Sequence, residues 1–123
     1  MSTDSQSVNR GEVWLVSFDP AIGAEIRKTR PAVVLSSNEV GILPLKLMAP
    51  ITEWKEAFAR NLWHVRLTPD PANGLRKISA VDVLQVRGMD VGRFVTKLGA
   101  LSPVALEKIT AALADLVEVP HRA

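Results

Sequence analysis

Short runs of apolar and β-branched residues, separated by turn residues, recur along most of this chain and predict a series of β-strands. Residues 11–18 (GEVWLVSF) alternate between the two faces of a strand. Residues 31–37 (PAVVLSS) are apolar almost throughout, which indicates a strand buried on both sides. Further strands are predicted at residues 43–51, 61–67 and 78–87.

Some of these segments carry signs of irregularity. Pro50 removes a ladder donor, so an edge or a bulge is expected there. Residues 78–87 are long enough for one strand or for a bent pair. We expect a polar loop at residues 53–60, and a turn or short helix around residues 90–96 that leads into a possible strand at 97–101.

Helical spacing occurs only near the end of the chain. Ser102 is a good N-cap, Pro103 suits a first helical turn, and Leu101 could pack on Leu106 as a hydrophobic staple. The residues that repeat at helical spacing are Leu106, Ile109, Leu113, Leu116 and Val117. We expect the helix to end at Val119-Pro120. The pattern therefore predicts a mainly β protein with a C-terminal helix and a barrel-like sheet.

A chain of 123 residues is expected to form one domain. Residues 1–9 lack a periodic apolar pattern and are predicted to be a flexible N-terminal arm. Residues 10–119 then form the single domain, and residues 120–123 form a tail.

The composition narrows the chemistry. The chain contains no cysteine, which excludes thiolate catalysis and Cys-based metal sites and fits a reducing compartment. Its polar start lacks the apolar core of a signal peptide, and no apolar run is long enough to span a membrane. We therefore expect a soluble, cytoplasmic protein that does not enter a membrane.

The formal net charge of +2 is too small to indicate a nucleic-acid partner by itself, but the basic residues are clustered. Arg27, Lys28 and Arg30 form one group, and Arg76-Lys77 forms another. Because Arg30 precedes Pro31, its backbone is biased to an extended conformation at the start of a strand. A guanidinium there could grip a phosphate with two donors. The alternative is a solvated run of charges at a sheet edge.

Other candidates for chemistry are few. Of the two histidines, His121 is expected to be solvated in the tail, and His64 is expected in a structural or surface role, with proximity to a bound nucleotide as the alternative. Trp54 and Trp63 could stack on bases, although packing within the protein explains them equally well. With two scattered histidines and no clustered carboxylates, we expect no metal and no cofactor.

Over residues 10–117 the chain resembles the PemK/MazF family of bacterial toxins. The matching segments are Arg10-Gly11-Glu12-Val13-Trp14-Leu15-Val16, Asp19-Pro20, Gly23-Ala24-Glu25, Arg30-Pro31-Ala32-Val33-Val34-Leu35, Ala49-Pro50-Ile51-Thr52, Gln85 with Arg87 and Asp90, and Lys97-Leu98-Gly99-Ala100-Leu101-Ser102. The resemblance implies an SH3-like small β-barrel that forms a homodimer. It also implies a type II toxin that cleaves single-stranded mRNA without a metal, selects its sites by sequence, and is neutralised by a cognate antitoxin.

The resemblance also implies site residues. Arg30 and Thr52 match the family's catalytic pair, and Glu25 matches an acidic position near the site. The residues expected to bind RNA are Arg27, Lys28, Arg76 and Gln85. The implied reaction is attack of a ribose 2′-hydroxyl on the adjacent phosphate, which leaves a 2′,3′-cyclic phosphate and a 5′-hydroxyl.

The chain departs from the family pattern at two positions. Leu84 stands directly before the glutamine, where some members have an acidic residue; Asp82 is two residues earlier and would point to the same face. Ala24 replaces a histidine found in some members. Two alternatives stay open: a non-enzymatic inhibitor, because toxins that poison a DNA topoisomerase share this fold, and a nucleic-acid-binding or adaptor barrel that has lost catalysis, which the Leu84 departure leaves possible. The presence of Arg30 and Thr52 argues against the inhibitor.

Overall fold

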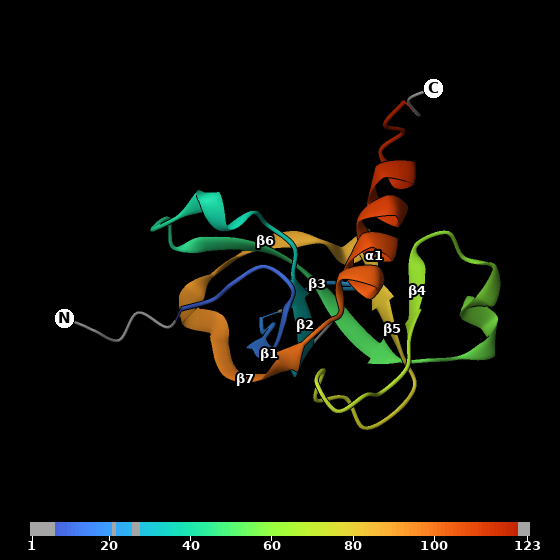
Figure 1. Ribbon diagram of the computed structural model, residues 1–123, viewed down its shortest axis with the longest axis horizontal. Coiled ribbons are helices and arrows are strands. Elements are labelled where there is room, and N and C mark those ends of the chain that lie inside the picture. The colour runs from blue at the N-terminus through green and yellow to red at the C-terminus, as the bar shows by residue number, and fades with distance from the viewer. Residues whose placement is uncertain (1–6, 21, 26–27, 121–123) are drawn as a thin grey trace.

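The computed structural model describes residues 7–20, 22–25 and 28–120. The strands are β1 (Glu12–Ser17), β2 (Thr29–Val34), β3 (Leu45–Glu53), β4 (His64–Leu67), β5 (Ser79–Asp82), β6 (Arg87–Asp90) and β7 (Phe94–Ala100), and they precede helix α1 (Pro103–Leu116) (Figure 1). Short 3₁₀ helices lie between them: η1 (Asn38–Val40), η2 (Glu56–Arg60), η3 (Val83–Gln85) and η4 (Val91–Arg93). The mainly β class with a C-terminal helix is confirmed.

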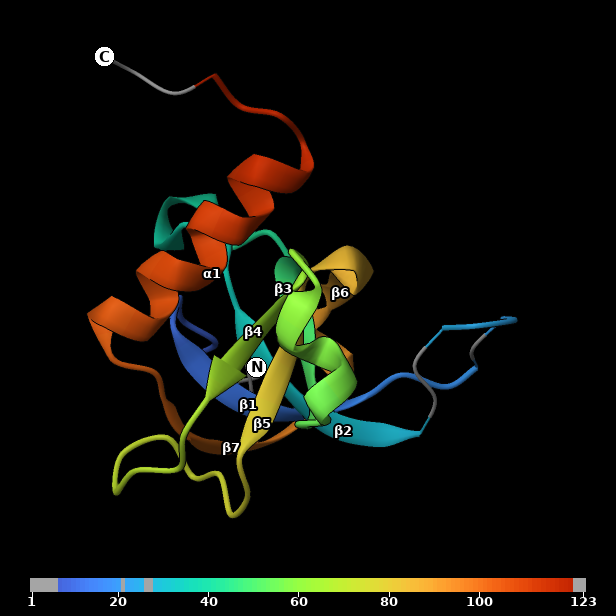
Figure 2. The ribbon, with the colours of Figure 1, turned by 90° about the vertical axis from the view of Figure 1, so that its right-hand side faces the viewer.

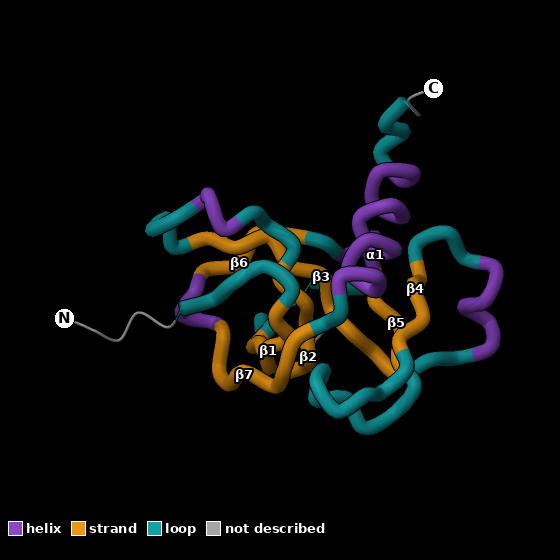
Figure 3. Tube along the Cα trace, in the orientation of Figure 1, coloured by secondary structure: helices purple, strands orange, loops and turns teal. Residues whose placement is uncertain are grey.

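All strand pairs are antiparallel, and the seven-stranded sheet has the order β4-β5-β3-β2-β1-β7, with β6 paired to β3. The sheet is strongly curved, and α1 lies across one of its faces (Figures 2 and 3). β4 and β7 are the ends of this order and are not paired with each other. The barrel-like fold is therefore confirmed, in a form whose sheet is not closed.

β3 changes partner at the predicted irregular position. Its residues 45–48 pair with β6 and its residues 51–53 pair with β5, so Ala49 and Pro50 pair with neither. Opposite them, η3 separates β5 from β6. Pro50 has no N–H, and it lies on β3 where the strand has no hydrogen-bonded partner on the β5–β6 side. The irregularity expected at Pro50 and the bent pair expected at residues 78–87 are therefore two sides of the same break in strand pairing.

Alternating residues of the central strands pack into two apolar clusters on opposite faces of the sheet. Val13 and Val33 belong to the cluster that includes Leu106 and Ile109 of α1, here called the helix-side core. The cluster on the other face, here called the opposite core, contains Val8, Trp14, Val16, Phe18, Ala32, Val34, Met48, Met89 and Phe94. Residues 31–35 contribute to both clusters, which confirms that this strand is buried on both sides.

Helix α1 begins as predicted but ends early. Oγ of Ser102 accepts a hydrogen bond from the backbone N–H of Ala105 at 3.1 Å, and Leu101 and Leu106 are both buried in the helix-side core. The helix ends at Leu116, and Val117 is 64% exposed. The prediction that Val117 belongs to the buried stripe was wrong, because it is already the C-terminal cap.

Other boundaries also differ from prediction. β3 and β4 begin at Leu45 and His64, two and three residues later than expected, while β7 begins at Phe94, three residues earlier. The loop expected at residues 53–60 instead contains η2, where the amide of Phe58 bonds to the carbonyl of Lys55.

The start of the domain lies earlier than expected. Residues 1–6 of the predicted arm lie outside the described residues, as do residues 121–123 of the predicted tail. Val8, however, is buried in the opposite core. It therefore belongs to the folded domain and not to a flexible arm.

Candidate active site

The loop between β1 and β2 is closed at its base. The backbone N–H of Phe18 bonds to the carbonyl of Lys28 at 2.8 Å, and the N–H of Lys28 bonds to Oδ1 of Asp19 at 2.9 Å. The Arg93 guanidinium donates to the carbonyls of Ser17 and Asp19. The described parts of the loop extend away from the sheet (Figure 2). These hydrogen bonds fix the two ends of the loop where it joins β1 and β2.

Arg30 and Thr52 occupy corresponding places on neighbouring strands. The antiparallel β2–β3 register pairs Ala32 with Pro50. Arg30 lies two residues before Ala32 and Thr52 lies two residues after Pro50, so both are displaced from this pair in the same direction. Because side chains alternate between faces, Arg30 shares the face of Ala32 and Thr52 the face of Pro50. Both therefore project on the face of the opposite core.

Arg30 and Thr52 also border a cavity of about 440 Å³, here called the Arg76 pocket. Its wall includes Arg76 and Lys77 from the loop between β4 and β5. This loop is held by Asn73, a buried residue whose Oδ1 accepts from the N–H of Leu75 at 3.0 Å and whose Nδ2 donates to the carbonyl of Thr68 at 3.0 Å. Three predicted site residues, Arg30, Thr52 and Arg76, therefore meet here.

A second cavity of about 620 Å³, here called the Gln85 pocket, contains two more predicted site residues, Glu25 and Gln85. It is completed by Trp63, Asp82, Leu84 and Arg87. Asp82 lies two residues along β5 from Ala80, the partner of Thr52. The Gln85 pocket and Thr52 are thus linked along one face of the sheet.

Charges within the Gln85 pocket are partly paired. Nη1 of Arg87 lies 3.8 Å from Oε1 of Glu25, and the same oxygen accepts a hydrogen bond from the backbone N–H of Ile22 at 2.8 Å. The Arg87 guanidinium also lies over the Phe18 ring, 5.4 Å from its centroid. Glu25 is thereby oriented by its own loop and by a cation from β6.

Asp82 holds the short helix that carries Gln85. Its Oδ1 caps η3 by accepting from the N–H of Leu84 at 3.2 Å, and its Oδ2 lies 3.4 Å from Nε2 of Gln85. Behind it, Nε2 of His64 is 3.9 Å from the same Oδ2. Burial lowers the pKa of His64 below its usual value, and the Asp82 carboxylate offsets only part of this effect. His64 is thus a neutral residue behind the pocket wall, in the predicted structural role.

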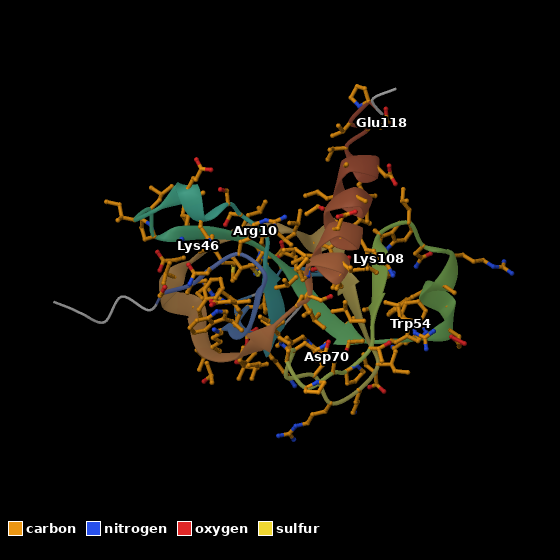
Figure 4. All side chains as sticks on the ribbon, viewed as in Figure 1. Arg10, Lys46, Trp54, Asp70, Lys108 and Glu118 are labelled. Atoms are coloured by element: carbon orange, nitrogen blue, oxygen red, sulfur yellow. The ribbon has the colours of Figure 1, made fainter. Side chains whose placement is uncertain are left out.

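The two tryptophans have different surroundings. Trp63 lines the Gln85 pocket. Trp54 lies beside η2 (Figure 4), where it makes an edge contact with Phe58 and carries the Arg66 guanidinium 5.6 Å from its ring centroid. The pocket position of Trp63 makes it the better candidate for contact with a base.

Of the remaining predicted residues, Lys28 is exposed and lines neither pocket, and Arg27 lies outside the described residues. In the part of the chain that is described, no group of three or more His, Cys, Asp or Glu side chains could hold a metal ion. Arg87 was not predicted as a site residue, because in the sequence it is a single arginine two residues after Gln85, with nothing local that indicates a role. Only its register opposite Met48 reveals the face that it shares with Thr52.

Comparison with known proteins shows which family the chain belongs to. The model of the PemK-like, MazF-like toxin of type II toxin–antitoxin systems matches residues 9–117. The chain belongs to this family. Among family members, it is 36% identical to the endoribonuclease toxin ChpB of Escherichia coli K12 over 112 residues, which cover 89% of this chain and 93% of ChpB. It is 28% identical to the endoribonuclease MazF9 of Mycobacterium tuberculosis, covering 86% and 92% of the two chains.

Solved structures share the fold. MazF from Deinococcus radiodurans superposes with a TM-score of 0.75 at 24% identity, covering 90% of this chain and 96% of that one. MazF in a MazE–MazF complex from the same organism gives 0.72, with 94% and 100% covered. Among the residues described for the present family member, no helix is both long and apolar enough to cross a membrane.

Proposed function

We propose that this chain is the toxin of a type II toxin–antitoxin system and a metal-independent, sequence-selective endoribonuclease that acts on single-stranded RNA. Its family and the endoribonuclease names of ChpB and MazF9 support this activity. The observation that carries the proposal is the placement of Arg30 and Thr52 two positions beyond the Ala32–Pro50 pair, on one face of adjacent strands.

The proposed reaction uses a nucleophile that belongs to the RNA. The ribose 2′-oxygen attacks the adjacent phosphorus, the bond from phosphorus to the 5′-oxygen breaks, and the products are a 2′,3′-cyclic phosphate and a 5′-hydroxyl. Arg30 directs its forked donors at the non-bridging oxygens, where negative charge develops, and Thr52 adds one hydroxyl donor. The charged donors of Arg30 contribute about 10²–10³ in rate, and the single neutral donor of Thr52 contributes less.

Glu25 is the proposed base for the 2′-hydroxyl proton, since an arginine does not lose its proton in proteins. Its side chain is 46% exposed and lies at the Gln85 pocket, so a bound ribose can reach it. As the bond from phosphorus to the 5′-oxygen breaks, that oxygen takes up a proton and leaves as the 5′-hydroxyl. Some family members have an acidic residue directly before the glutamine, but this chain has Leu84 there. Glu25 is therefore proposed to take the role of the base.

RNA binding is assigned to the same surface. Arg76 lies beside Arg30 and Thr52, Gln85 lies in the neighbouring pocket, and Lys28 is exposed at the base of the loop. Arg27 joins this proposed set from outside the described residues. Cations that contact phosphates would hold the strand, and Gln85 would contact a base edge.

Two protein partners are proposed. The first is a cognate antitoxin, as in the Deinococcus MazE–MazF structures. The second is another copy of this chain, because apolar side chains remain exposed on one stretch leading into β3: Ile42, Leu43, Leu45 and Leu47. Light scattering should therefore give about twice the chain mass of 13.4 kDa. Such a toxin would act in the cytoplasm, where mRNA is found.

One observation favours a second candidate. Leu84 is 60% exposed at the Gln85 pocket, where an apolar side chain adds nothing to proton transfer. A barrel that binds nucleic acid without cutting it would have the same surface. A cleavage assay can separate the two candidates.

The deciding experiment incubates the protein with a long single-stranded RNA and maps the product ends. Cleavage that leaves cyclic phosphate and 5′-hydroxyl ends, survives excess EDTA, and disappears when the cut nucleotide carries a 2′-deoxy sugar is the expected result. Uncut RNA, or cleavage of the 2′-deoxy substrate, would contradict the proposal.

A further inference from the structure

The strand register continues the line that holds Arg30 and Thr52 across two further strands. Arg30 lies opposite Thr52 in the continuation of the β2–β3 register. Thr52 pairs with Ala80 of β5, and Ala80 pairs in turn with Arg66 of β4. Because residues that face each other on antiparallel strands project on the same face of the sheet, these residues form one line across β2, β3, β5 and β4. It is here called the site row.

Arg66 is the exposed cation at the far end of the site row. Ala80 is fully buried, whereas Arg66 is exposed on β4, the strand that ends the sheet order. Neighbouring strands lie about 4.8 Å apart, so the backbones of Thr52 and Arg66 are separated by roughly 10 Å. Arg66 therefore lies beside the proposed cleavage site, where an adjoining part of the same RNA strand can lie.

Trp54 holds the Arg66 guanidinium on the side of the catalytic pair. The guanidinium lies 5.6 Å from the centroid of the indole ring. The backbone N–H of Trp54 bonds to the carbonyl of Ile78 at 3.0 Å, so the β3–β5 ladder continues through Trp54 and places its side chain on the face of Thr52. Nε1 of Trp54 donates to Oε2 of Glu56 at 3.0 Å, which fixes the ring. Arg66 is thus drawn from β4 back toward the strand that carries Thr52.

This stacking leaves the donors of Arg66 available. An aromatic ring covers one face of a guanidinium, whereas the N–H groups lie in its plane and point outward from its edge. Within the described part of the chain, no ion pair includes Arg66, and the carboxylate of Glu56 accepts from the indole instead. An exposed and oriented guanidinium that no carboxylate neutralises is suited to a phosphate.

We propose that Arg66 binds a backbone phosphate of the RNA that flanks the scissile phosphate, and that Trp54 orients the guanidinium for this contact. The inference rests on the proposed function for the nature of the ligand. It extends the RNA-binding surface from the catalytic pair across β5 to the edge strand β4. The site row then sets the direction in which the RNA crosses the sheet.

The test measures affinity for an RNA whose cut nucleotide is 2′-deoxy, so that it is not consumed. In a set of such RNAs, one phosphate at a time is replaced by an uncharged methylphosphonate. One flanking replacement should weaken binding by the wild-type protein about tenfold, as expected for a charged hydrogen bond. Arg66→Gln should bind the unmodified RNA about tenfold more weakly and be indifferent to that replacement. Its slope of log affinity against log salt concentration should be smaller by about 0.7, because one phosphate contact is lost.

Arg10 provides a matched control, since its Nε donates to the Leu35 carbonyl at 3.2 Å and it lines neither of the two site pockets. Arg10→Gln removes the same charge and should keep the full wild-type pattern. Trp54→Leu leaves Arg66 in place but removes its support, so it should weaken the contact with the same phosphate, and Trp54→Phe should restore it. A purely structural contact between Arg66 and Trp54 would change the melting temperature without changing which phosphate matters.

An Arg66→Gln protein that keeps the wild-type pattern of methylphosphonate sensitivity would overturn the proposal. So would an equal loss of affinity in Arg10→Gln, because net charge would then explain the effect. Arg66→Lys is a second variant that keeps the charge without the planar fork, and it should retain sensitivity to the same phosphate at lower affinity. If the wild-type protein cut no RNA but bound the unmodified RNA with an Arg66-dependent phosphate contact, the proposed function would fail while this inference would stand.

Discussion

The Asp82 carboxylate lies 3.9 Å from Nε2 of His64, and the two side chains are only 13% and 8% exposed. Phe58 stacks on the imidazole with ring centroids 3.8 Å apart, and Nδ1 lies 3.1 Å from Nδ2 of Asn61. If the Asn61 amide donates, Nδ1 accepts and the ring proton is on Nε2, facing Asp82. A neutral imidazole therefore supports the carboxylate that caps η3 and contacts Gln85.

This arrangement predicts how stability depends on pH. Burial lowers the pKa of His64 in the folded state, so the unfolded chain binds a proton at higher pH than the folded one. The free energy of unfolding should therefore be fully maintained above about pH 6.5 and fall as the pH drops toward the lowered pKa of the folded state. Denaturant titrations across this window should show the decrease, and His64→Gln should remove this part of it. An NMR titration that placed the His64 pKa above its usual value would contradict the prediction.

Arg30→Ala should lower kcat by at least about 10², because it removes the donors aimed at the charge that develops on the phosphate. Arg30→Lys should also fail, since a point charge does not reproduce the planar fork. Arg30 lies beyond the apolar part of β2, so both variants should keep the wild-type circular dichroism spectrum and melting temperature. Wild-type cleavage by Arg30→Ala would disprove the mechanism even in a correctly folded protein.

Thr52→Ala should be milder, with a loss of about tenfold in kcat, because it removes one neutral donor and not a charge. Thr52→Ser keeps the hydroxyl and is the matched control, which should cut at close to the wild-type rate. Single-turnover kinetics of the three proteins measure the difference. Equal losses for Ser and Ala would mean that the methyl group and not the hydroxyl of Thr52 matters.

The strands and the helix start could be predicted from sequence because their signals are local. The alternation in residues 11–18, the apolar run at 31–37 and the Ser102-Pro103 cap each act within a few residues. The exact ends could not be predicted in the same way. The start of β7 at Phe94 depends on pairing with Val16, far away in the sequence.

The site was predictable only in part for a similar reason. Arg30 and Thr52 could be proposed as site residues by resemblance, because each belongs to a short motif with a fixed spacing. Arg87 acquires its place through the register of β6 on β3 and through its contact with Phe18, neither of which a local pattern contains. Likewise, the link from Asp82 to His64 is made across the β4–β5 pair.

Gly99 should be intolerant of a side chain, because the loop between β4 and β5 passes very close to it. A Cβ at Gly99 would lie 2.3 Å from the carbonyl oxygen of Ala72, which belongs to the backbone and cannot swing away. Gly99→Ala should destabilise the protein by about 1–3 kcal/mol and weaken RNA binding through displacement of Arg76. Gly88→Ala is the control, since a Cβ there meets nothing within 4 Å. Denaturant unfolding that shows equal stability for the two variants would disprove this tight contact.

The proposed antitoxin contact can be tested through charge. Lys28 and Arg76 are both exposed on the surface assigned to RNA, and an acidic antitoxin segment would use the same cations. Lys28→Glu combined with Arg76→Glu should slow association with the cognate antitoxin by at least about tenfold at low salt, because electrostatic steering acts mainly on the association rate. The difference from wild type should shrink as salt screens the exposed charges.

Lys108→Glu reverses one charge on the exposed surface of α1, away from the proposed groove. It is the control for either single change, Lys28→Glu or Arg76→Glu, and makes half the charge change of the double variant. It changes net charge without changing the groove, so it should reduce the association rate much less than the double variant. Stopped-flow measurements at several salt concentrations separate the two effects. If Lys108→Glu slowed association as much as the double variant does, net charge would account for the attraction, and the antitoxin segment would not be placed over Lys28 and Arg76.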